Sequence, residues 1–321
     1  MTAEPVTAEP VVAEPVVAPP PTPGPVSEEP SQGPVQVVEA GPVEHHSGPA
    51  DPDAPVAHAW MPRPVCDDRC VVPVPGEPTV GRARRWARLA AAGAVLACAV
   101  PLALGYGLLD SRTRDAVLRG WNRAILTAFG VRLRVTGAIP AGGALLVANH
   151  VSWLDIVAIE AVRPTRMVAK HELRTWPLVG RLATAAGTLY LDRERLSTLP
   201  ATVADIANAL RAGDTVTMFP EGTTWCGRRG GPFRPAAFQA AIDAGAPVVP
   251  VALRFVLDGS RVTTATPAYV GSHSLWAVLC RTAALRGLTV EVQLLPAVPH
   301  DPAANRRTLA AAAGHAVATT R

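Results

Sequence analysis

Residues 144–155 read ALLVANHVSWLD, an apolar run followed by a polar pair and then by a helix-like segment. The run ALLVA has the length and apolar character of a buried strand, and the following stretch WLDIVAIEAV suits a helix. His150 lies between the two. Because functional loops in α/β folds follow the C-terminal ends of strands, we expect His150 to face a functional site.

Asp155 lies five residues after His150. On one continuous helix, side chains five positions apart point about 140° away from each other. If His150 instead lies at the strand–helix turn, a carboxylate in the first helical turn can reach back to the imidazole. Such a contact fixes the ring tautomer and raises the basicity of the other nitrogen, which can then take a proton from an alcohol. The alternative is that His150 is a packed polar residue and Asp155 a charge that favours the helix start.

Glu221 lies in the sequence FPEGTT at 219–224, directly after the β-rich run DTVTM. Proline and glycine on either side of a glutamate are typical of a tight turn, which would hold the carboxylate at the end of the strand. Thr223 is then placed to donate a hydrogen bond to a polar head group. The alternative is an ordinary turn with a solvated glutamate.

Two cations, Lys170 and Arg193, each follow a predicted strand. Lys170 is the only lysine among 30 basic residues, which invites a chemical explanation. Two cations at one edge of a sheet suit a phosphate, with arginine as a fork and lysine as a point charge. The alternative for Arg193 is a surface ion pair with Asp192 or Glu194.

From residue 131 onward, β-rich runs alternate with helical stretches, which indicates one α/β domain over residues 131–321. The predicted strands are 131–136, 144–148, 166–169, 188–191, 215–219, 248–255, 261–266 and 289–295. The predicted helices are 153–162, a stretch near 176–186, 198–212, 236–244 and 303–319.

Residues 1–80 differ from the rest in composition. They hold 19 of the 33 prolines and carry 12 acidic residues against two basic ones, a net charge of −10, whereas the remainder carries 28 basic against 14 acidic residues, a net charge of +14. Proline at every fifth position of the opening TAEPV repeat blocks helices, so we predict a disordered tail over 1–80. The basic remainder suits anionic partners such as phosphate-bearing substrates, acyl carriers or membrane lipids. No helix-turn-helix, zinc-finger or aromatic RNA-binding signature supports a nucleic-acid partner.

Residues 81–130 predict a membrane-embedding segment. The run 89–109 has no charged side chain and is long enough to cross a bilayer core as a helix. Pro101 would kink that helix, and arginines lie at both of its ends, at positions 82, 84, 85 and 88 and at 112, 114, 119 and 123. We therefore predict a re-entrant helix at the cytoplasmic face of the cell membrane and an amphipathic partner over 111–130. A single-pass anchor and a buried core helix are the alternatives.

The cysteines are too few and too scattered for a disulfide framework and favour a reducing compartment; they are Cys66, Cys70, Cys98, Cys226 and Cys280. The first two form a C-x3-C pair, and three histidines lie upstream, His45, His46 and His58. One such pair without a second at matching spacing is weak support for a metal site, so no metal ligand is predicted.

Four motifs occur in a fixed order: NHVSWLD, then KHEL followed by Pro177, Gly180, Gly187 and Arg193, then FPEGT, and then VVPVAL. This succession resembles the glycerolipid acyltransferase family, typified by 1-acylglycerol-3-phosphate acyltransferase, over about residues 120–300. The resemblance implies a single mixed-sheet α/β acyltransferase domain preceded by a membrane-embedding helical hairpin.

The resemblance also implies roles for particular residues. It implies that His150 and Asp155 are the catalytic pair. It implies that Lys170 and Arg193 bind the acceptor or its phosphate. The acceptor-binding turn would be formed by Glu221, Gly222 and Thr223.

The expected reaction moves a fatty acyl group from an acyl thioester, on coenzyme A or acyl carrier protein, to the free hydroxyl of a lysolipid. The expected acceptor is 1-acylglycerol-3-phosphate, which would give phosphatidic acid, and no metal or cofactor is expected beyond the co-substrate. Members that act on lysophosphatidate commonly read FPEGTRS, whereas this chain has Thr224 and Trp225 in place of Arg-Ser. Similar lyso-ornithine-lipid acyltransferases often carry FPEGTT, so that acceptor stays open.

Two functions of other kinds are alternatives to acyl transfer. A lipid esterase is disfavoured because neither G-x-S-x-G nor H-E-x-x-H occurs. A non-catalytic membrane scaffold that recruits partners through its proline-rich tail is the remaining alternative.

Overall fold

We analysed a computed structural model of the chain. It describes residues 66–71, 76–99, 101, 105, 108–176, 179–259, 262–299 and 305–321. The chain divides into two units, 1–56 and 57–321, and every described residue belongs to the second. Most of the predicted tail, residues 1–65 and 72–75, and the three upstream histidines therefore lie outside the described residues.

A seven-stranded sheet organises the described unit, in the order β1-β7-β6-β2-β5-β3-β4. All neighbouring strands are parallel except β6 and β7, which are antiparallel. The prediction of a mixed sheet is therefore confirmed. The strands are β1 (Arg132–Thr136), β2 (Leu145–Ala148), β3 (Arg166–Lys170), β4 (Leu189–Leu191), β5 (Val216–Met218), β6 (Val248–Leu257) and β7 (Leu288–Leu294).

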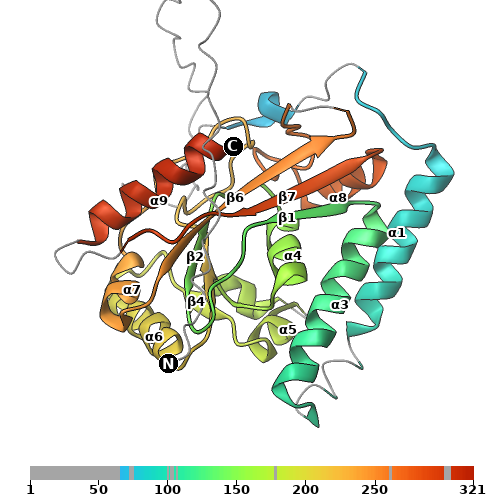
Figure 1. Ribbon diagram of the computed structural model, residues 1–321. Coiled ribbons are helices and arrows are strands. Elements are labelled where there is room, and N and C mark those ends of the chain that lie inside the picture. Colours follow the sequence, from blue (N-terminus) through green and yellow to red (C-terminus); the bar gives the residue numbers. More distant parts are fainter. Residues whose placement is uncertain are drawn as a thin grey trace, which may run out of the picture. The chain divides into compact units, whose positions relative to one another are not determined.

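Helices cover both faces of the sheet (Figure 1). On one face lie α1 (Arg82–Ala97), α3 (Ser111–Phe129), α4 (Trp153–Val162) and α8 (Leu275–Ala284), and on the other lie α6 (Leu199–Arg211), α7 (Phe238–Ala244) and α9 (Arg306–Thr320). The remaining helical elements are η1 (Asp68–Val71), η3 (His171–Thr175), α5 (Val179–Ala185) and η4 (Leu196–Thr198).

The central strand β2 is buried on both faces because its residues alternate between two apolar clusters. Leu146 and Ala148 pack in the cluster that contains α3 and α4, whereas Leu145 and Val147 pack in the cluster that contains α6 and α9. Successive side chains of a strand point to opposite faces, so an entirely apolar strand is what a three-layer fold requires. β2 ends at Ala148, so His150 lies just beyond the C-terminal end of this buried central strand.

The predicted helical pair is present, but its boundaries differ from the prediction. Helices α1 and α3 lie side by side (Figure 1). The indole N–H of Trp121 in α3 donates to the carbonyl of Val95 in α1 at 3.0 Å. The arginines expected to precede the apolar helix lie within α1, and Arg88 donates to the carbonyls of Ala283 and Leu285 at 3.0 and 2.6 Å. Helix α1 is therefore attached to the α/β domain by its own arginine.

Within the described residues, no helix has both the length and the apolar character needed to cross a bilayer. The predicted re-entrant turn around Pro101 falls largely outside the described residues, since 100, 102–104 and 106–107 are not among them. The apolar face predicted for 111–130 is buried against protein, with Ile125, Leu126 and Phe129 in the core.

The predicted strand at 261–266 is wrong for its described part. Residues 262–266 form a loop with a single bridge, Thr263 to Val256. The hydroxyls of Thr264 and Thr266 both donate to the carboxylate of Glu77 at 2.6 Å. A run of β-branched residues favours a strand locally, but here the half-buried carboxylate of Glu77, from a distant segment, accepts the hydroxyl groups of the threonines. Helix α8, which follows this loop, was not predicted.

The boundary of the predicted tail at residue 80 is also wrong. Cys66 and Val71 are 3% exposed and belong to the core, and Val71 is the last residue of η1. Val80 donates its backbone N–H to the carbonyl of Ala284 at 2.8 Å. Composition predicted disorder for this stretch, yet its few apolar side chains pack on a surface that the rest of the domain provides.

Candidate active site

Asn149 holds the chain in place where β2 ends. Its side chain is fully buried and makes two hydrogen bonds to the backbone of Leu253 in β6, accepting from the N–H at 2.8 Å and donating to the carbonyl at 3.0 Å. An amide side chain can satisfy a neighbouring strand in this way because it offers both a donor and an acceptor. The position of the next residue, His150, is thereby fixed relative to β6.

His150 and Asp155 meet as the turn hypothesis requires. The His150 Nδ1 lies 2.8 Å from Asp155 Oδ2, and the same oxygen accepts the backbone N–H groups of Val151 at 2.6 Å and Ser152 at 2.7 Å. The Asp155 side chain is fully buried, in the first turn of α4, and the His150 side chain is 20% exposed. Because a carboxylate oxygen only accepts, the hydrogen of a neutral imidazole is on Nδ1, and Nε2 then has the lone pair.

Phe219 and Glu221 fix the histidine from the neighbouring strand. β5 is the hydrogen-bonded neighbour of β2, so the loops after these two strands leave the same edge of the sheet. The ring of Phe219 stacks on the imidazole, with centroids 4.1 Å apart and an interplanar angle of 17°. Glu221 Oε2 accepts the backbone N–H of His150 at 2.8 Å. The two motifs therefore form one site.

Glu221 is buried and bonded, so it is not a solvated turn residue. Its other oxygen, Oε1, accepts the N–H of Gly231 at 3.1 Å and faces Arg321 Nη1 at 3.2 Å. Burial raises the pKa of Glu221 to about 7, while the His150 N–H and the charge of Arg321 act in the opposite direction. Gly222 has a φ of +75°, which glycine adopts without strain and which turns the chain after the carboxylate.

The two cations lie at the expected sheet edge and already have protein contacts. β3 and β4 are paired with Lys170 opposite Leu191, so Lys170 and Arg193 leave adjacent strand ends. Arg193 is half-buried, donates to the carbonyl of Gly222 at 2.6 Å, and has a pKa lowered by burial. Lys170 is exposed, with Nζ 5.9 Å from the ring centre of Trp176. The ion pair weighed for Arg193 is not found, and Asp192 instead bonds Arg195.

Hydrogen bonds connect the turn after Glu221 to two other segments of the chain. Thr223 is half-buried in this turn. The hydroxyl of Thr224 donates to the carbonyl of Tyr269, and Trp225 donates its N–H to the carbonyl of His150 at 2.7 Å. Tyr269 in turn donates its N–H to the carbonyl of Val151 at 2.9 Å. The segments that contain His150, Thr224 and Tyr269 are thus joined through their backbones.

Three residues of this site were not predicted. Phe219 belongs to a motif that was identified, but no role was assigned to its ring. Arg321 and Tyr269 are separated from the motifs by many residues and carry no local signal. Two cavities of about 500 and 510 Å³ lie beside residues 227–235 and α9; Arg321 lines both, and His150 lines neither.

Comparisons with known proteins find related acyltransferases. The model of the Acyltransferase family matches residues 132–254. A 1-acyl-sn-glycerol-3-phosphate acyltransferase of Neisseria meningitidis serogroup B is 37% identical over 191 residues, which is 59% of this chain and 73% of that protein. Two lyso-ornithine lipid O-acyltransferases are also similar. That of Pseudomonas aeruginosa is 36% identical, over 58% of this chain and 71% of its own, and that of Rhizobium meliloti is 31% identical, over 72% and 85%.

The fold has a counterpart among solved structures. The 1-acyl-sn-glycerophosphate acyltransferase PlsC of Thermotoga maritima superposes with a TM-score of 0.50 at 18% identity, covering 73% of this chain and 97% of its own. The family model and these relatives identify the chain as an enzyme of the acyltransferase class. The chain belongs to the glycerolipid acyltransferase family.

Proposed function

We propose that the enzyme transfers a fatty acyl group from an acyl thioester to the free hydroxyl of a lysolipid, with His150 as general base and Asp155 as its partner. The observation that carries this proposal is the 2.8 Å contact between His150 Nδ1 and Asp155 Oδ2. It leaves Nε2 able to accept a proton from a hydroxyl group.

In the proposed reaction, Nε2 of His150 takes the hydroxyl proton as the oxygen attacks the thioester carbonyl. The buried carboxylate of Asp155 stabilises the imidazolium that forms. The carbon–sulfur bond then breaks, and the imidazolium returns the proton to the thiolate. The products are the new ester and the free thiol of coenzyme A or acyl carrier protein, without a metal, a cofactor or a covalent enzyme intermediate.

The first candidate acceptor is 1-acylglycerol-3-phosphate, which would give phosphatidic acid. Lys170 and Arg193 leave adjacent strand ends, where a phosphate would meet both charges. In this proposal Arg193 also holds Gly222, and Glu221, Gly222 and Thr223 form the turn that meets the acceptor. The Neisseria relative is named for this acceptor.

A lyso-ornithine lipid is the second candidate acceptor. This acceptor has a carboxylate and an amine in place of the phosphate. Thr224 and Trp225 follow the FPEGT sequence, with no cation at either position, and Thr224 is bonded to Tyr269. The Pseudomonas and Rhizobium relatives are named for this acceptor.

We further propose that the enzyme works at the cytoplasmic face of the membrane, with α1 on the lipid surface. Helix α1 exposes Trp86 by 60% and Leu96 by 46%, and Arg82 and Arg84 of its first turns are exposed as well. An apolar face flanked by arginines is typical of a helix that lies in an anionic interface.

A panel experiment tests the function. The purified enzyme is incubated in mixed micelles with acyl-CoA or acyl-ACP and, one at a time, 1-acylglycerol-3-phosphate and a lyso-ornithine lipid, and products are identified by mass. We expect a new ester, and we expect His150→Ala to lower its rate by about 10³-fold or more with an unchanged melting temperature. His171→Ala, which alters the other histidine near the sheet edge, is the matched control.

The outcomes separate the alternatives. Full activity of His150→Ala would refute the assigned base. Release of free fatty acid in place of an ester would identify an esterase, and binding without any product would support the scaffold function. The acceptor with the higher kcat/KM decides between the two candidates.

A further inference from the structure

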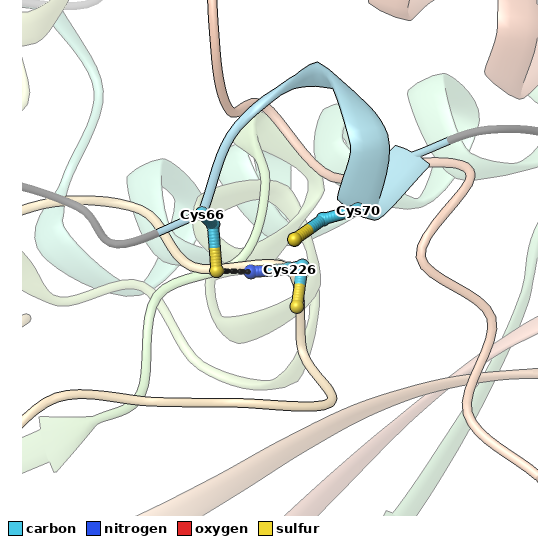
Figure 2. A group of neighbouring side chains, drawn as sticks. All are labelled: Cys66, Cys70 and Cys226. Carbon is cyan, nitrogen blue, oxygen red and sulfur yellow. Dashed lines mark hydrogen bonds between the residues drawn. The ribbon is translucent and has the colours of Figure 1, made fainter. Parts of the chain in front are cut away.

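Three cysteines from distant parts of the chain come together outside the catalytic pair. The sulfur atoms of Cys66, Cys70 and Cys226 all lie within 4.8 Å of one another, and Figure 2 shows the three side chains converging. Cys66 and Cys70 belong to the segment around η1, and Cys226 lies two residues after Thr224. All three are free thiols. The C-x3-C pair therefore has a third sulfur that its spacing did not reveal.

The segment with the first two cysteines is anchored without help from the thiols. The carboxylate of Asp68 accepts the N–H and the hydroxyl of Ser272 at 2.9 and 2.8 Å, and it lies 3.1 Å from Nδ1 of His273. Cys66 and Cys226 are only 3% and 2% exposed, whereas Cys70 is half-buried. The three sulfur atoms are thus held close together, and of the three cysteines Cys70 is the most accessible to solvent.

The polar groups around Cys226 suit a sulfur that carries negative charge. The backbone N–H groups of Arg228 and Arg229 donate hydrogen bonds to the sulfur of Cys226. The N–H of Cys226 itself donates to Sγ of Cys66 at 3.4 Å (Figure 2). Gly227, with a φ of +83°, provides the turn that brings these amides round to the sulfur. Backbone N–H donors on sulfur are typical partners of metal-bound thiolates.

A disulfide would use only two of these sulfurs and leave the third without a role. A tetrahedral Zn²⁺ with bonds to sulfur of about 2.3 Å places its sulfur ligands about 3.8 Å apart, which the observed cluster allows. We propose that Cys66, Cys70 and Cys226 bind one Zn²⁺ ion, with water or an added ligand at the fourth position. Binding would release the protons of those cysteines that are thiols, and three thiolates with Zn²⁺ would carry a net charge of −1.

The position of the cluster suggests a structural role. Cys226 follows the turn that contains Glu221, and the next residues include Gly231, whose N–H donates to Glu221. A Zn²⁺ at the cluster would therefore join the N-terminal segment to the loop that holds the His150 backbone through Glu221. The ion is not part of the acyl-transfer step, so this proposal stands independently of the proposed function.

Metal analysis of the intact protein tests the proposal. The full-length chain is purified from cells grown with zinc and without chelators, and its metal content is measured by mass spectrometry of the elements. We expect about one zinc per chain, and loss of that zinc in Cys226→Ser and in Cys70→Ser. Cys98→Ser, which alters an exposed cysteine outside the cluster, should retain it. If Cys226→Ser does not fold, Cys70→Ser tests the same prediction, because it removes the more accessible sulfur.

A second measurement needs no variant. After the zinc is removed and Co²⁺ is added, we expect the absorption bands of thiolate-to-cobalt charge transfer and of tetrahedral Co²⁺. A wild-type protein with no zinc and no such bands would overturn the proposal. So would an intact mass two hydrogens below that of the free thiols with a peptide linking Cys66 to Cys226, which would identify a redox pair.

Discussion

The carboxylate of Asp155 accepts three hydrogen bonds on one oxygen, from the His150 ring and from two backbone N–H groups at the start of α4. Asp155 Oδ2 is therefore both a negative charge at a helix start and a partner that orients the histidine ring. The N-terminal turn of a helix favours a negative charge, so the fold stabilises the carboxylate where the imidazolium would need it.

Asp155→Asn should separate these two functions. The amide oxygen can still accept from the backbone N–H groups, but the charge that stabilises an imidazolium is lost. We expect kcat to fall about 10²- to 10⁴-fold, with a melting temperature close to that of the wild type. Asp110→Asn alters another carboxylate that accepts an N–H at a helix start, that of Thr113, and should leave kcat unchanged. Equal kcat values in the two variants would contradict the assigned role of Asp155.

Arg193 should act on the acceptor turn through Gly222. Removing a charge-assisted hydrogen bond costs about 1.5–3 kcal/mol, so Arg193→Gln should lower kcat/KM about 10- to 100-fold. Arg195→Gln, two positions on, removes an exposed arginine that pairs with Asp192 and should change kcat/KM little. If both variants had the same kcat/KM, neither the hydrogen bond nor the charge of Arg193 would matter to the acceptor.

At the scale of elements, α1 packs against the domain along one side, through Arg88, Ala92 and Val95, and is exposed on the other. Arg88 and Leu89 contact the domain, whereas Arg82, Arg84 and Trp86 are exposed. Trp86 is 60% exposed and lies between arginines in the sequence, which is consistent with the proposed lipid contact.

The double variant Arg82→Gln/Arg84→Gln should weaken binding to vesicles that contain anionic lipid. Each arginine near such a surface contributes about 1 kcal/mol, so we expect a loss of about 10- to 30-fold in the partition coefficient, measured by vesicle sedimentation. Arg306→Gln/Arg307→Gln, at the exposed start of α9, removes the same charge from the opposite face of the sheet. An equal loss in both variants would show that net charge, and not α1, determines binding.

At the scale of the whole molecule, the central helix α4 carries a buried acid besides Asp155. Glu160 Oε1 accepts the N–H and the hydroxyl of Thr165 at 3.0 and 2.9 Å, and burial raises the pKa of Glu160 to about 7 from a usual value of 4.5. The folded state therefore keeps a proton that the unfolded chain releases. The stabilisation is fully present below pH 4.5 and is lost as the pH rises through 7.

Glu160→Gln should reduce this pH dependence, because Gln keeps the accepting oxygen and does not ionise. Between pH 5 and pH 8, the free energy of unfolding of the wild type should fall by up to about 3 kcal/mol more than that of the variant, measured by urea denaturation. Glu221, whose pKa is also raised to about 7, should leave a residual slope of the same sign in the variant. Identical slopes in both proteins would contradict a raised pKa at Glu160.

Much of the fold and of the site was predictable from local pattern. Six of the eight predicted strands, those of β1 to β5 and β7, agree within one residue at each end, and the helix 153–162 agrees at both ends. The strand predicted at 248–255 extends two residues further as β6. These elements could be predicted from the sequence because apolar periodicity and turn residues determine structure over short stretches of chain. The meeting of His150 and Asp155 was predictable for the same reason, since both belong to one strand–turn–helix unit.

Contacts between segments that are far apart in the sequence could not be predicted from local pattern. The pairing of Glu221 with Arg321, the burial of Cys66 beside Cys226, and the capture of Thr264 by Glu77 each join residues 100 or more positions apart. Composition predicted disorder up to residue 80, although Cys66 and Val71 are in the core. The β-rich pattern predicted a strand at 261–266, of which the described residues 262–266 form a loop. A short stretch of chain determines its own backbone preference. Which side chains meet across the molecule depends on the spatial order of the strands, and only the folded sheet shows that order.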